Sequence, residues 1–500
     1  MKPTGPDLSF EASPVNDVAL APRLSTIRTV TLATGMLLTY FLGAASTGSV
    51  TILIPRMASD LGKTELETQW VASAYTFAFA CGLIFSGRLA DTLGRRKLYL
   101  AGLTIYAVFA VVTGVVKNRV ALSLCRAMSG LGMSIASPAG FGIIGATIRH
   151  EPARTIAFAA SGLGNPIGAV FGNLIGGLMA SIGPNGWSYL FFLLAGLAAL
   201  LLAGAFFIVP SDPDVGKKFD ERIDWTGGLC VTAGICLFTF SLTESGIAVD
   251  GWRASYVPAL LATSLVLLAV FVLWSLHLEH RTTFPPIFKI SVFTRRHGLV
   301  GITLACVLLI SMCILAWIYT TSIFCQNYKG LSPLANALAV LPAPIVGLFA
   351  AAAVVLLAPR VSTPHILCVG SAMTAASSIM YAAWPEGTSF WALEFPAQLI
   401  HPWGTDFVFG LGNILMSNLV DQNELSVGGA LFQTSGQVGG ALGICLSSLI
   451  SSEIAEQAGS VLAGVRAAFY FSAACGFAVS VIALLGFRNV KLAKDVGQIQ

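Results

Sequence analysis

The sequence GRLADTLGRRK occupies residues 87–97 and connects two apolar segments that are each long enough to cross a membrane. It carries one carboxylate, Asp91, and four cationic side chains. Segments rich in Lys and Arg stay on the cytoplasmic side of a membrane, because they resist translocation. The basic segment, as residues 87–97 are called here, therefore predicts a multi-span membrane protein and indicates which side of the membrane it faces.

The composition of the chain supports the same class. Of its 500 residues, 55% are hydrophobic and 10% are charged, and the mean hydropathy is +0.80. Soluble domains carry about 25% charged residues. The net charge of +4 is spread over many segments and does not indicate nucleic acid binding. Ten cysteines lie in or beside apolar segments without metal-ligand spacing, so we interpret them as small core residues and expect no metal site.

Fourteen segments have the apolar length of about twenty residues that a transmembrane helix needs. They are residues 29–55, 68–87, 98–116, 119–147, 156–181, 187–209, 225–244, 254–277, 298–325, 333–358, 365–384, 390–419, 427–451 and 464–487. An even number of spans places both ends of the chain on one side of the membrane. If that side is the cytoplasm, the cytoplasmic segments contain 20 of the 28 Lys and Arg residues. We therefore expect both termini to be cytoplasmic.

The connecting segments indicate how the spans are grouped. The longest cytoplasmic connections, at 210–224 and 278–297, flank the seventh and eighth spans. Two similar six-span halves are a recurring transporter design. We therefore expect a cytoplasmic tail at 1–28, a six-helix bundle at 29–209, linkers with two extra helices at 210–297, a second six-helix bundle at 298–487 and a cytoplasmic tail at 488–500.

The basic segment resembles the signature between the second and third spans of the major facilitator superfamily. The matching positions are Gly87, Asp91, Gly94, Arg95 and Arg96. The sequence LCRAMSGLG at 124–132, which contains Arg126, is similar to the intramembrane arginine motif of that superfamily. The resemblance implies an all-α integral membrane protein with the major-facilitator fold, in which two six-helix bundles rock about a central cavity. It also implies a monomer surrounded by membrane lipid.

Further motifs resemble one branch of the superfamily, the fourteen-span drug:proton antiporters. Besides the span count, these are the sequence QWVASAY at 69–75 and a glycine-rich fifth span that is similar to the antiporter motif, with Asn173 in place of its usual proline. The glycines concerned are Gly168, Gly172, Gly176 and Gly177. The sequence FWALEFPA at 390–397, followed by Asp406, resembles fungal exporters of the aminotriazole- and boron-resistance type. The resemblance implies proton-coupled export of a small organic molecule, such as a drug, toxin or secondary metabolite, by alternating access.

Asp91 is the residue that a purely topological role of the basic segment does not require. Its carboxylate could pair with Arg95 or cap a helix N-terminus, and would then form a conformational latch together with Gly87, Gly94 and Arg96. The glycines would permit a tight turn and a close approach of helices. The alternative is that the segment only orients the protein in the membrane.

Three ionisable side chains inside the predicted spans are candidates for proton coupling. Arg126 is costly at membrane depth and needs a partner or an aqueous cavity, unless its side chain reaches the nearby interface. Asp406 lies in the twelfth span, where burial favours the protonated carboxyl group and so suits alternating protonation. A structural hydrogen bond between helices is the alternative role. His401 is the second choice, and the adjacent Pro402 is expected to kink the helix.

The glycines of the fifth span, four residues apart, predict a ridge for close helix packing. The resemblance implies that this ridge seals one half of the protein against the other, and simple packing is the alternative. Side chains suited to a substrate cavity are Ser46, Gln69, Tyr75, Trp317, Tyr319 and Asn413. Aromatic residues near helix ends are equally expected as anchors at the membrane interface.

The sequence lacks the motifs of an ATP-driven pump or a hydrolase. Gly62-Lys63-Thr64 is not preceded by the glycine of a Walker sequence, and no G-x-S-x-G segment occurs. We therefore expect a transporter rather than an enzyme, driven by the proton gradient and without a cofactor. An importer of a small solute and a non-transporting membrane sensor on the same fold are the alternatives. We expect it in the plasma membrane, with the vacuolar membrane as the alternative.

Overall fold

The computed structural model describes residues 25–148, 150, 152–210, 222–245, 248 and 251–492, and the regular structure within these residues is helical. The expected tails at 1–28 and 488–500 therefore lie largely outside the described residues, as does most of the linker at 210–224.

The helices fall into two halves with a pair between them. The first half contains α2 (Thr26–Leu61), α3 (Glu65–Leu93), α4 (Arg95–Val115), α5 (Arg119–Thr147), α6 (Ala153–Gly162), α7 (Gly164–Ser181) and α8 (Gly186–Ile208). The pair is α10 (Trp225–Ser245) and α11 (Tyr256–Arg281), with short 3-10 turns η1 (Gly251–Arg253) and η2 (Ile290–Thr294). The second half contains α12 (Arg295–Ile323), the π-helical turn η3 (Phe324–Tyr328), α13 (Pro333–Val340), α14 (Pro342–Leu357), α15 (Thr363–Ala382), α16 (Glu394–Ile400), α17 (Pro402–Leu419), α18 (Leu425–Ala458) and α19 (Val461–Gly486).

Within the described residues, 13 helical segments are long and apolar enough to cross a membrane. They correspond to all the predicted spans except the one at 390–419. That segment forms α16 and α17, which meet at His401 and Pro402. A proline has no N–H and clashes with the preceding turn, so Pro402 begins a new helix rather than continuing the old one. The kink predicted at Pro402 is thus a break between two helices.

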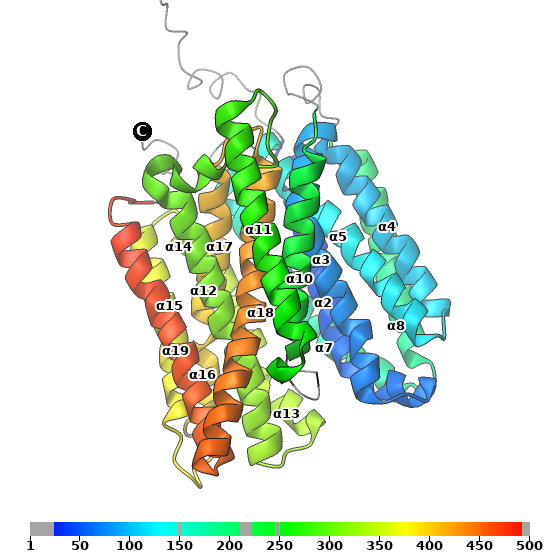
Figure 1. Ribbon diagram of the computed structural model, residues 1–500, viewed down its shortest axis with the longest axis vertical. Coiled ribbons are helices and arrows are strands. Elements are labelled where there is room, and N and C mark those ends of the chain that lie inside the picture. The colour runs from blue at the N-terminus through cyan, green and yellow to red at the C-terminus, as the bar shows by residue number, and fades with distance from the viewer. Residues whose placement is uncertain are drawn as a thin grey trace, which may run out of the picture.

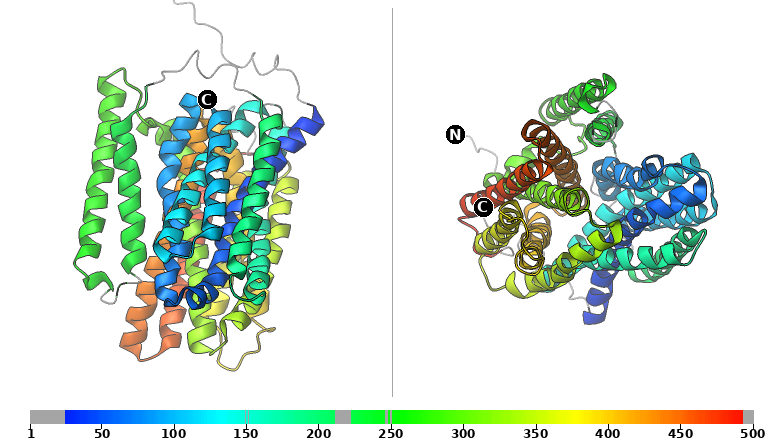
Figure 2. Two further views of the ribbon diagram at one scale, coloured as in Figure 1. Left: turned by 90° about the vertical axis from the view of Figure 1, so that its right-hand side faces the viewer. Right: turned by 90° about the horizontal axis from the view of Figure 1, so that it is seen from below.

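The two halves stand side by side, and α10 and α11 form a hairpin outside them (Figures 1 and 2). The hairpin packs on α3 of the first half, where the rings of Trp70 and Phe240 are 5.7 Å apart. It also contacts α18 of the second half, where Ser245 Oγ lies 3.6 Å from Cys445 Sγ. The start of α2 and the end of the described chain lie at one end of the bundle, which we call the terminal face (Figure 2). The opposite end is the distal face.

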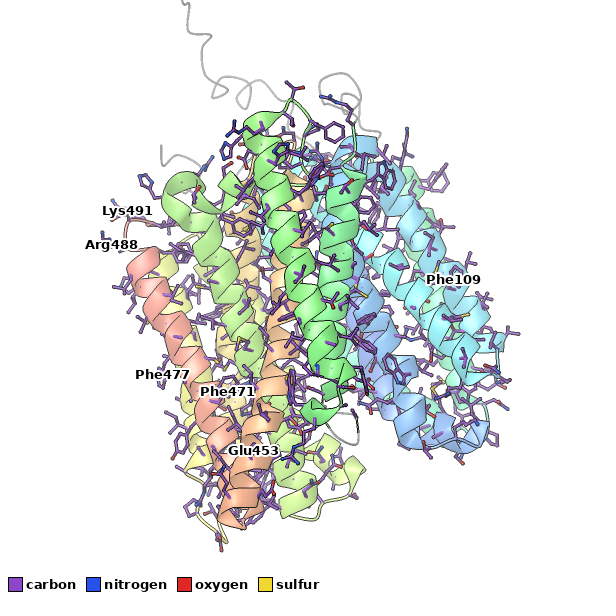
Figure 3. The ribbon with its side chains drawn as sticks, viewed as in Figure 1. Phe109, Glu453, Phe471, Phe477, Arg488 and Lys491 are labelled. Atoms are coloured by element: carbon purple, nitrogen blue, oxygen red, sulfur yellow. The ribbon has the colours of Figure 1, made fainter. Side chains whose placement is uncertain are left out.

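The outer surface of the bundle is apolar. Phe477 of α19 is 42% exposed, and Phe109 lies on α4 at the opposite side of the molecule (Figure 3). The charged Arg488 and Lys491 lie at the terminal face, whereas Glu453 lies toward the distal face (Figure 3). An apolar belt between two charged ends is the surface that a lipid bilayer requires. The protein is therefore an integral, multi-pass membrane protein.

The basic segment is almost entirely helical, whereas the predicted spans ended at residue 87 and began again at residue 98. α3 continues to Leu93 and α4 begins at Arg95, so only Gly94 separates them. Gly94 has φ 107°, a conformation that residues with a side chain rarely adopt. The tight turn is therefore made by this single glycine, and Gly87 has a different role that is described below.

The glycines of α7 form a ridge against α2. A Cβ atom at Gly168, Gly172 or Gly176 would lie 2.4, 2.5 or 2.7 Å from the carbonyl oxygen of Phe41, Ala45 or Ser49, respectively. A Cβ atom at Gly177 would meet nothing within 4 Å, so this residue lies off the ridge. Both helices belong to the first half. The ridge therefore closes a contact inside one half and does not seal one half against the other.

The second half repeats this arrangement between α12 and α18. A Cβ atom at Gly439 or Gly443 would lie 2.2 or 2.4 Å from the carbonyl oxygen of Leu308 or Met312. Corresponding helix pairs in the two halves therefore use glycines four residues apart for the same close approach. This contact is the clearest structural trace of an internal repeat.

Candidate functional site

Asp91 lies where the two halves meet at the terminal face. It stands near the end of α3 and is 4% exposed. Arg95, one turn further on, binds Asp91 Oδ1 through Nε at 2.9 Å and through Nη2 at 2.8 Å. Both partners of this buried ion pair belong to the first half, and each also forms hydrogen bonds to the second half.

The Asp91 carboxylate also accepts two hydrogen bonds from the N-terminus of α18. The backbone N–H of Ser426 donates to Oδ1 at 3.2 Å, and that of Val427 donates to Oδ2 at 3.0 Å. The first N–H groups of a helix lack partners within the helix and carry the positive end of its dipole. The geometry thus combines both possibilities raised for Asp91, the pairing with Arg95 and the capping of a helix.

Three arginines bind the other side of the turn between α17 and α18. Arg95 Nη2 donates to the carbonyl oxygen of Gln422 at 2.6 Å. Arg154 of α6 donates to the carbonyl oxygen of Ser417, and Arg296 of α12 donates to that of Asn418 at 2.8 Å. Cations are favourable at a helix C-terminus because the last carbonyl groups carry its negative end. The α17–α18 turn is therefore bound by charges of the appropriate sign at both ends.

Small residues allow α3 and α5 to approach α18 closely at this place. A Cβ atom at Gly87 would lie 2.7 Å from Ala430 Cβ, and one at Gly142 would lie 2.1 Å from Ser426 Oγ. Arg96 Nη2 donates to the carbonyl oxygen of Phe206 in α8, within the first half, at 2.6 Å. Of the five predicted latch residues, Gly87, Asp91 and Arg95 thus meet the second half.

Arg126 of α5 is buried in the middle of the first half and is 1% exposed. Its Nη1 donates to Ser46 Oγ of α2 at 2.7 Å, and its Nε donates to the carbonyl oxygen of Val71 at 3.2 Å. The Tyr75 ring lies 4.4 Å below the guanidinium carbon. Within the described residues no carboxylate pairs with it, and Nη2 has no hydrogen-bond partner. The Arg126 side chain therefore binds protein groups and does not extend to the membrane interface.

His401 and Asp406 do not form a common site. His401 is 1% exposed and stacks on Trp317 of α12, with 3.9 Å between ring centroids. Asp406 is half-buried at a different place, where its Oδ2 would lie 3.1 Å from a Cβ atom at Gly347 of α14. In the part of the chain that the structure describes, no hydrogen bond or ion pair involves the Asp406 carboxylate. The structural hydrogen bond considered for Asp406 is therefore not found among these residues.

The predicted cavity residues are likewise distributed over separate places. Ser46 and Tyr75 surround Arg126, while the Tyr319 hydroxyl donates to Ser448 Oγ at 3.0 Å. Gln69 is exposed at the distal end of α3, and Asn413 is 5% exposed in α17. A cavity of about 280 Å³ lies between α2, α4, α5 and α8, and none of the predicted residues lines it. The described residues contain no group of side chains that could hold a metal ion.

One contact between the halves was not anticipated from the sequence. Ser137 of α5 donates to Gln433 Oε1 of α18 at 2.8 Å. Both residues lie on long helices with mixed polar and apolar faces, so no sequence signal singles them out. The contact extends the closure of the halves from the terminal face toward the middle of the bundle.

The two helical halves repeat the same close helix packing and are joined at one face by charged contacts on helix ends. Repeated halves of this kind recur among membrane transporters. The family model described as Major Facilitator Superfamily matches residues 36–444. The chain belongs to the major facilitator superfamily and is a transporter. The family and fold predicted from the sequence are thereby confirmed.

Several characterised transporters are similar to the chain. The efflux pump terJ of Aspergillus terreus is 27% identical over 451 residues, covering 89% of this chain and 84% of the relative. The low affinity ammonium transporter of Saccharomyces cerevisiae is 27% identical over 420 residues, covering 81% and 78%. The cephamycin export protein CmcT of Amycolatopsis lactamdurans is 26% identical over 456 residues, covering 88% and 91%. The solved structure of the proton:xylose symporter XylE has a TM-score of 0.66 at 10% identity and covers 95% of this chain and 99% of that one, which shows the common fold.

Proposed function

We propose that this transporter exports small organic molecules in exchange for protons, by alternating access between the two sides of the membrane. The observation that carries the proposal is the closure of the terminal face by Asp91, Arg95 and Arg154 on the ends of α17 and α18. These contacts are hydrogen bonds to helix ends. Each half is held together separately by its own glycine contacts, so the halves can part there as rigid bodies.

The terminal face is the cytoplasmic one in this proposal. The cytoplasmic segments then contain 20 of the 28 Lys and Arg residues, as the positive-inside rule requires. Both chain termini are then cytoplasmic, and the contacts at Asp91 keep the cytoplasmic side closed. The protein functions as a monomer in the plasma membrane, with the vacuolar membrane as the alternative.

Protons are coupled to export through groups inside the halves. Asp406 is the first candidate, because its half-buried carboxylate has no partner among the described residues and can change its protonation without breaking a contact. His401 is the second candidate. Arg126 contributes a fixed positive charge whose Nη2 is available to a substrate or a water molecule.

Export as the direction of transport is supported by the relatives. The names of terJ and CmcT describe an efflux pump and an export protein, and both cover more than four fifths of this chain. Import of a small cation is the second candidate function, favoured by the similarity to the yeast low affinity ammonium transporter.

Cellular accumulation distinguishes these functions. A panel of drugs and metabolites is measured in cells that express the chain, with and without a protonophore. Reduced accumulation that the protonophore abolishes supports proton-coupled export. Reduced accumulation that the protonophore leaves unchanged contradicts the proton coupling, and increased uptake of methylammonium supports the second candidate.

A further inference from the structure

One face of α16, together with the C-cap residue His401 that continues it, carries three polar side chains that are almost completely buried. Glu394, Gln398 and His401 are 2%, 1% and 1% exposed. Their spacing of four and three residues places them on the same face of the helix, one turn above another. Burying polar groups is costly unless they are hydrogen-bonded. This polar face of α16 therefore calls for an explanation, and the partners of the three residues indicate one.

Glu394, at the distal end, is paired with a cation that water can reach. Its Oε1 binds Lys329 Nζ, and the Lys329 side chain is 20% exposed. The ammonium group lies 4.9 Å from the ring centroids of both Phe324 and Trp384. Lys329 directly follows the π-helical turn η3, a kind of turn that is frequent at functional sites. The ion pair thus lies between the distal solution and the buried polar face.

Deeper in the bundle the partners are incomplete. Gln398 Nε2 donates to the Tyr381 hydroxyl at 3.1 Å and to the carbonyl oxygen of Ala339 at 2.7 Å, but its Oε1 has no partner among the described residues. The same holds for both ring nitrogens of His401 and for Nε1 of Trp317, which stacks on it. Every tautomer of His401 carries an N–H donor, so no tautomer is satisfied by the described protein groups. Buried polar atoms in this situation are normally bound by water.

Other titratable or charged groups surround this region from the neighbouring helices. They are Cys325 in η3, Lys329 after it, Tyr381 in α15 and Arg466 in α19. Arg466 is occupied by the carbonyl oxygen of Trp384 at 2.9 Å. Of these groups, Lys329 is the one that forms an ion pair with the polar face, through Glu394.

We propose that the polar face of α16 is a hydrated proton pathway from the distal solution into the second half, with Glu394 as its entrance and His401 as its inner end. This inference rests on the proposed function, for which it names the outer proton route. A proton from the solution binds the Glu394 carboxylate in place of Lys329, whose ammonium remains charged and turns to water. The proton passes through water held by Gln398 to a His401 ring nitrogen, which gives an imidazolium and restores the Glu394 anion.

The inner end of the pathway lies at the break between α16 and α17. Thr374 of α15 bridges this break, since its hydroxyl donates to the carbonyl oxygen of His401 at 2.6 Å and accepts from the N–H of Gly404 at 3.0 Å. A charge on His401 therefore arises at a junction of two helices that the Thr374 hydroxyl bridges. Protonation there is placed to act on the position of α17, which carries Asp406.

Trp317 provides a readout that needs no transported substrate, because a protonated imidazole quenches the fluorescence of an indole stacked on it. The full-length protein is placed in lipid vesicles with the distal face outward, and the outer pH is lowered rapidly. The Trp317 signal of each protein is its fluorescence minus the fluorescence of the same protein carrying Trp317→Phe. We expect this signal to fall after the pH drop in wild type and to remain constant in His401→Gln. A constant signal in wild type overturns the proposal.

The role of Glu394 as the entrance is tested by the rate at which the Trp317 signal falls after the pH drop. We expect Glu394→Gln to slow it by about tenfold or more, the lower range for loss of an acid–base group. Glu453→Gln is the matched control, because Glu453 is exposed near the same face and lies outside the pathway. The double variant Lys329→Gln/Glu394→Gln removes both charges and leaves no unpaired ammonium. A rapid response in a folded double variant, judged by its melting temperature, overturns the proposal.

The pathway and the proposed function fail in different ways. Export that a protonophore abolishes, together with a Trp317 signal that ignores pH, overturns the pathway alone. A Trp317 response that requires Glu394, together with export that ignores the protonophore, supports the pathway and overturns the coupling in the proposed function.

Discussion

The carboxylate of Asp91 accepts a hydrogen bond from the backbone N–H of Val427 at 3.0 Å, although 336 residues separate the two in the sequence. This bond joins the end of a helix in the first half to the start of a helix in the second. Its strength depends on a full negative charge at the positive end of the α18 dipole. The contact therefore offers a direct way to alter the balance between closed and open states of the terminal face.

We expect Asp91→Asn to favour opening of the terminal face. The variant keeps the shape of the side chain but loses the charge, and hydrogen bonds to a charged group are worth about 1.5–3 kcal/mol. The measurement is the labelling rate of a cysteine at Ala430, which is 0% exposed in the closed state, in a background without other reactive cysteines. Labelling from the terminal face should accelerate. An unchanged rate, as expected for the control Glu453→Gln, would contradict the latch.

The glycine ridge predicts opposite outcomes for two neighbouring residues. Gly172→Ala places a methyl group 2.5 Å from the Ala45 carbonyl oxygen, whereas Gly177→Ala places one in open space. We expect the first variant to lose about 1–3 kcal/mol of stability through overpacking and the second to remain close to wild type. The melting temperatures of the purified variants in detergent provide the comparison. Equal melting temperatures would remove the case for a tight α2–α7 contact.

Arg126 is expected to tolerate no replacement, including lysine. A lysine ammonium cannot reproduce the two directions in which the guanidinium donates, toward Ser46 Oγ and the Val71 carbonyl oxygen. We expect Arg126→Lys to abolish proton-driven transport in vesicles. Ser46→Ala removes one of the two bonds and should reduce transport only in part. Full transport by Arg126→Lys would show that a positive charge alone suffices and would contradict the specific role.

Asp406 is tested by separating coupled transport from exchange. Asn is similar in size but does not titrate in the physiological range, so Asp406→Asn should lose accumulation driven by a proton gradient while substrate exchange without a gradient continues. The rate of exchange should also become less dependent on pH than in wild type. Vesicle assays in the two modes provide the measurement. Intact gradient-driven accumulation in Asp406→Asn would exclude Asp406 from coupling and leave His401 as the candidate.

The sequence predicted the fold because that information is local. A run of about twenty apolar residues, a proline such as Pro402 and a cluster of cations at residues 87–97 each act through their immediate surroundings of lipid, water and backbone. The helical bounds accordingly follow the predicted spans, and the family follows from motifs within them. The exceptions are the predicted span at 390–419, which is broken into α16 and α17, and the basic segment, where α3 and α4 extend beyond the predicted spans because one glycine suffices for the turn.

The tertiary structure decided which residues meet. The spacing of Gly168, Gly172 and Gly176 predicted a ridge, but only packing determined that α2 covers it and that Gly177 faces open space. Asp91 was recognised as a latch candidate, yet its partners on α18 lie in the other half of the chain. The surroundings of His401, which leave its ring nitrogens without partners among the described residues, are built by Trp317 of α12 and Thr374 of α15. Hydrophobicity and helix propensity act over a few neighbouring residues, whereas partners hundreds of residues apart are selected by the shape and charge of whole helices packed against one another.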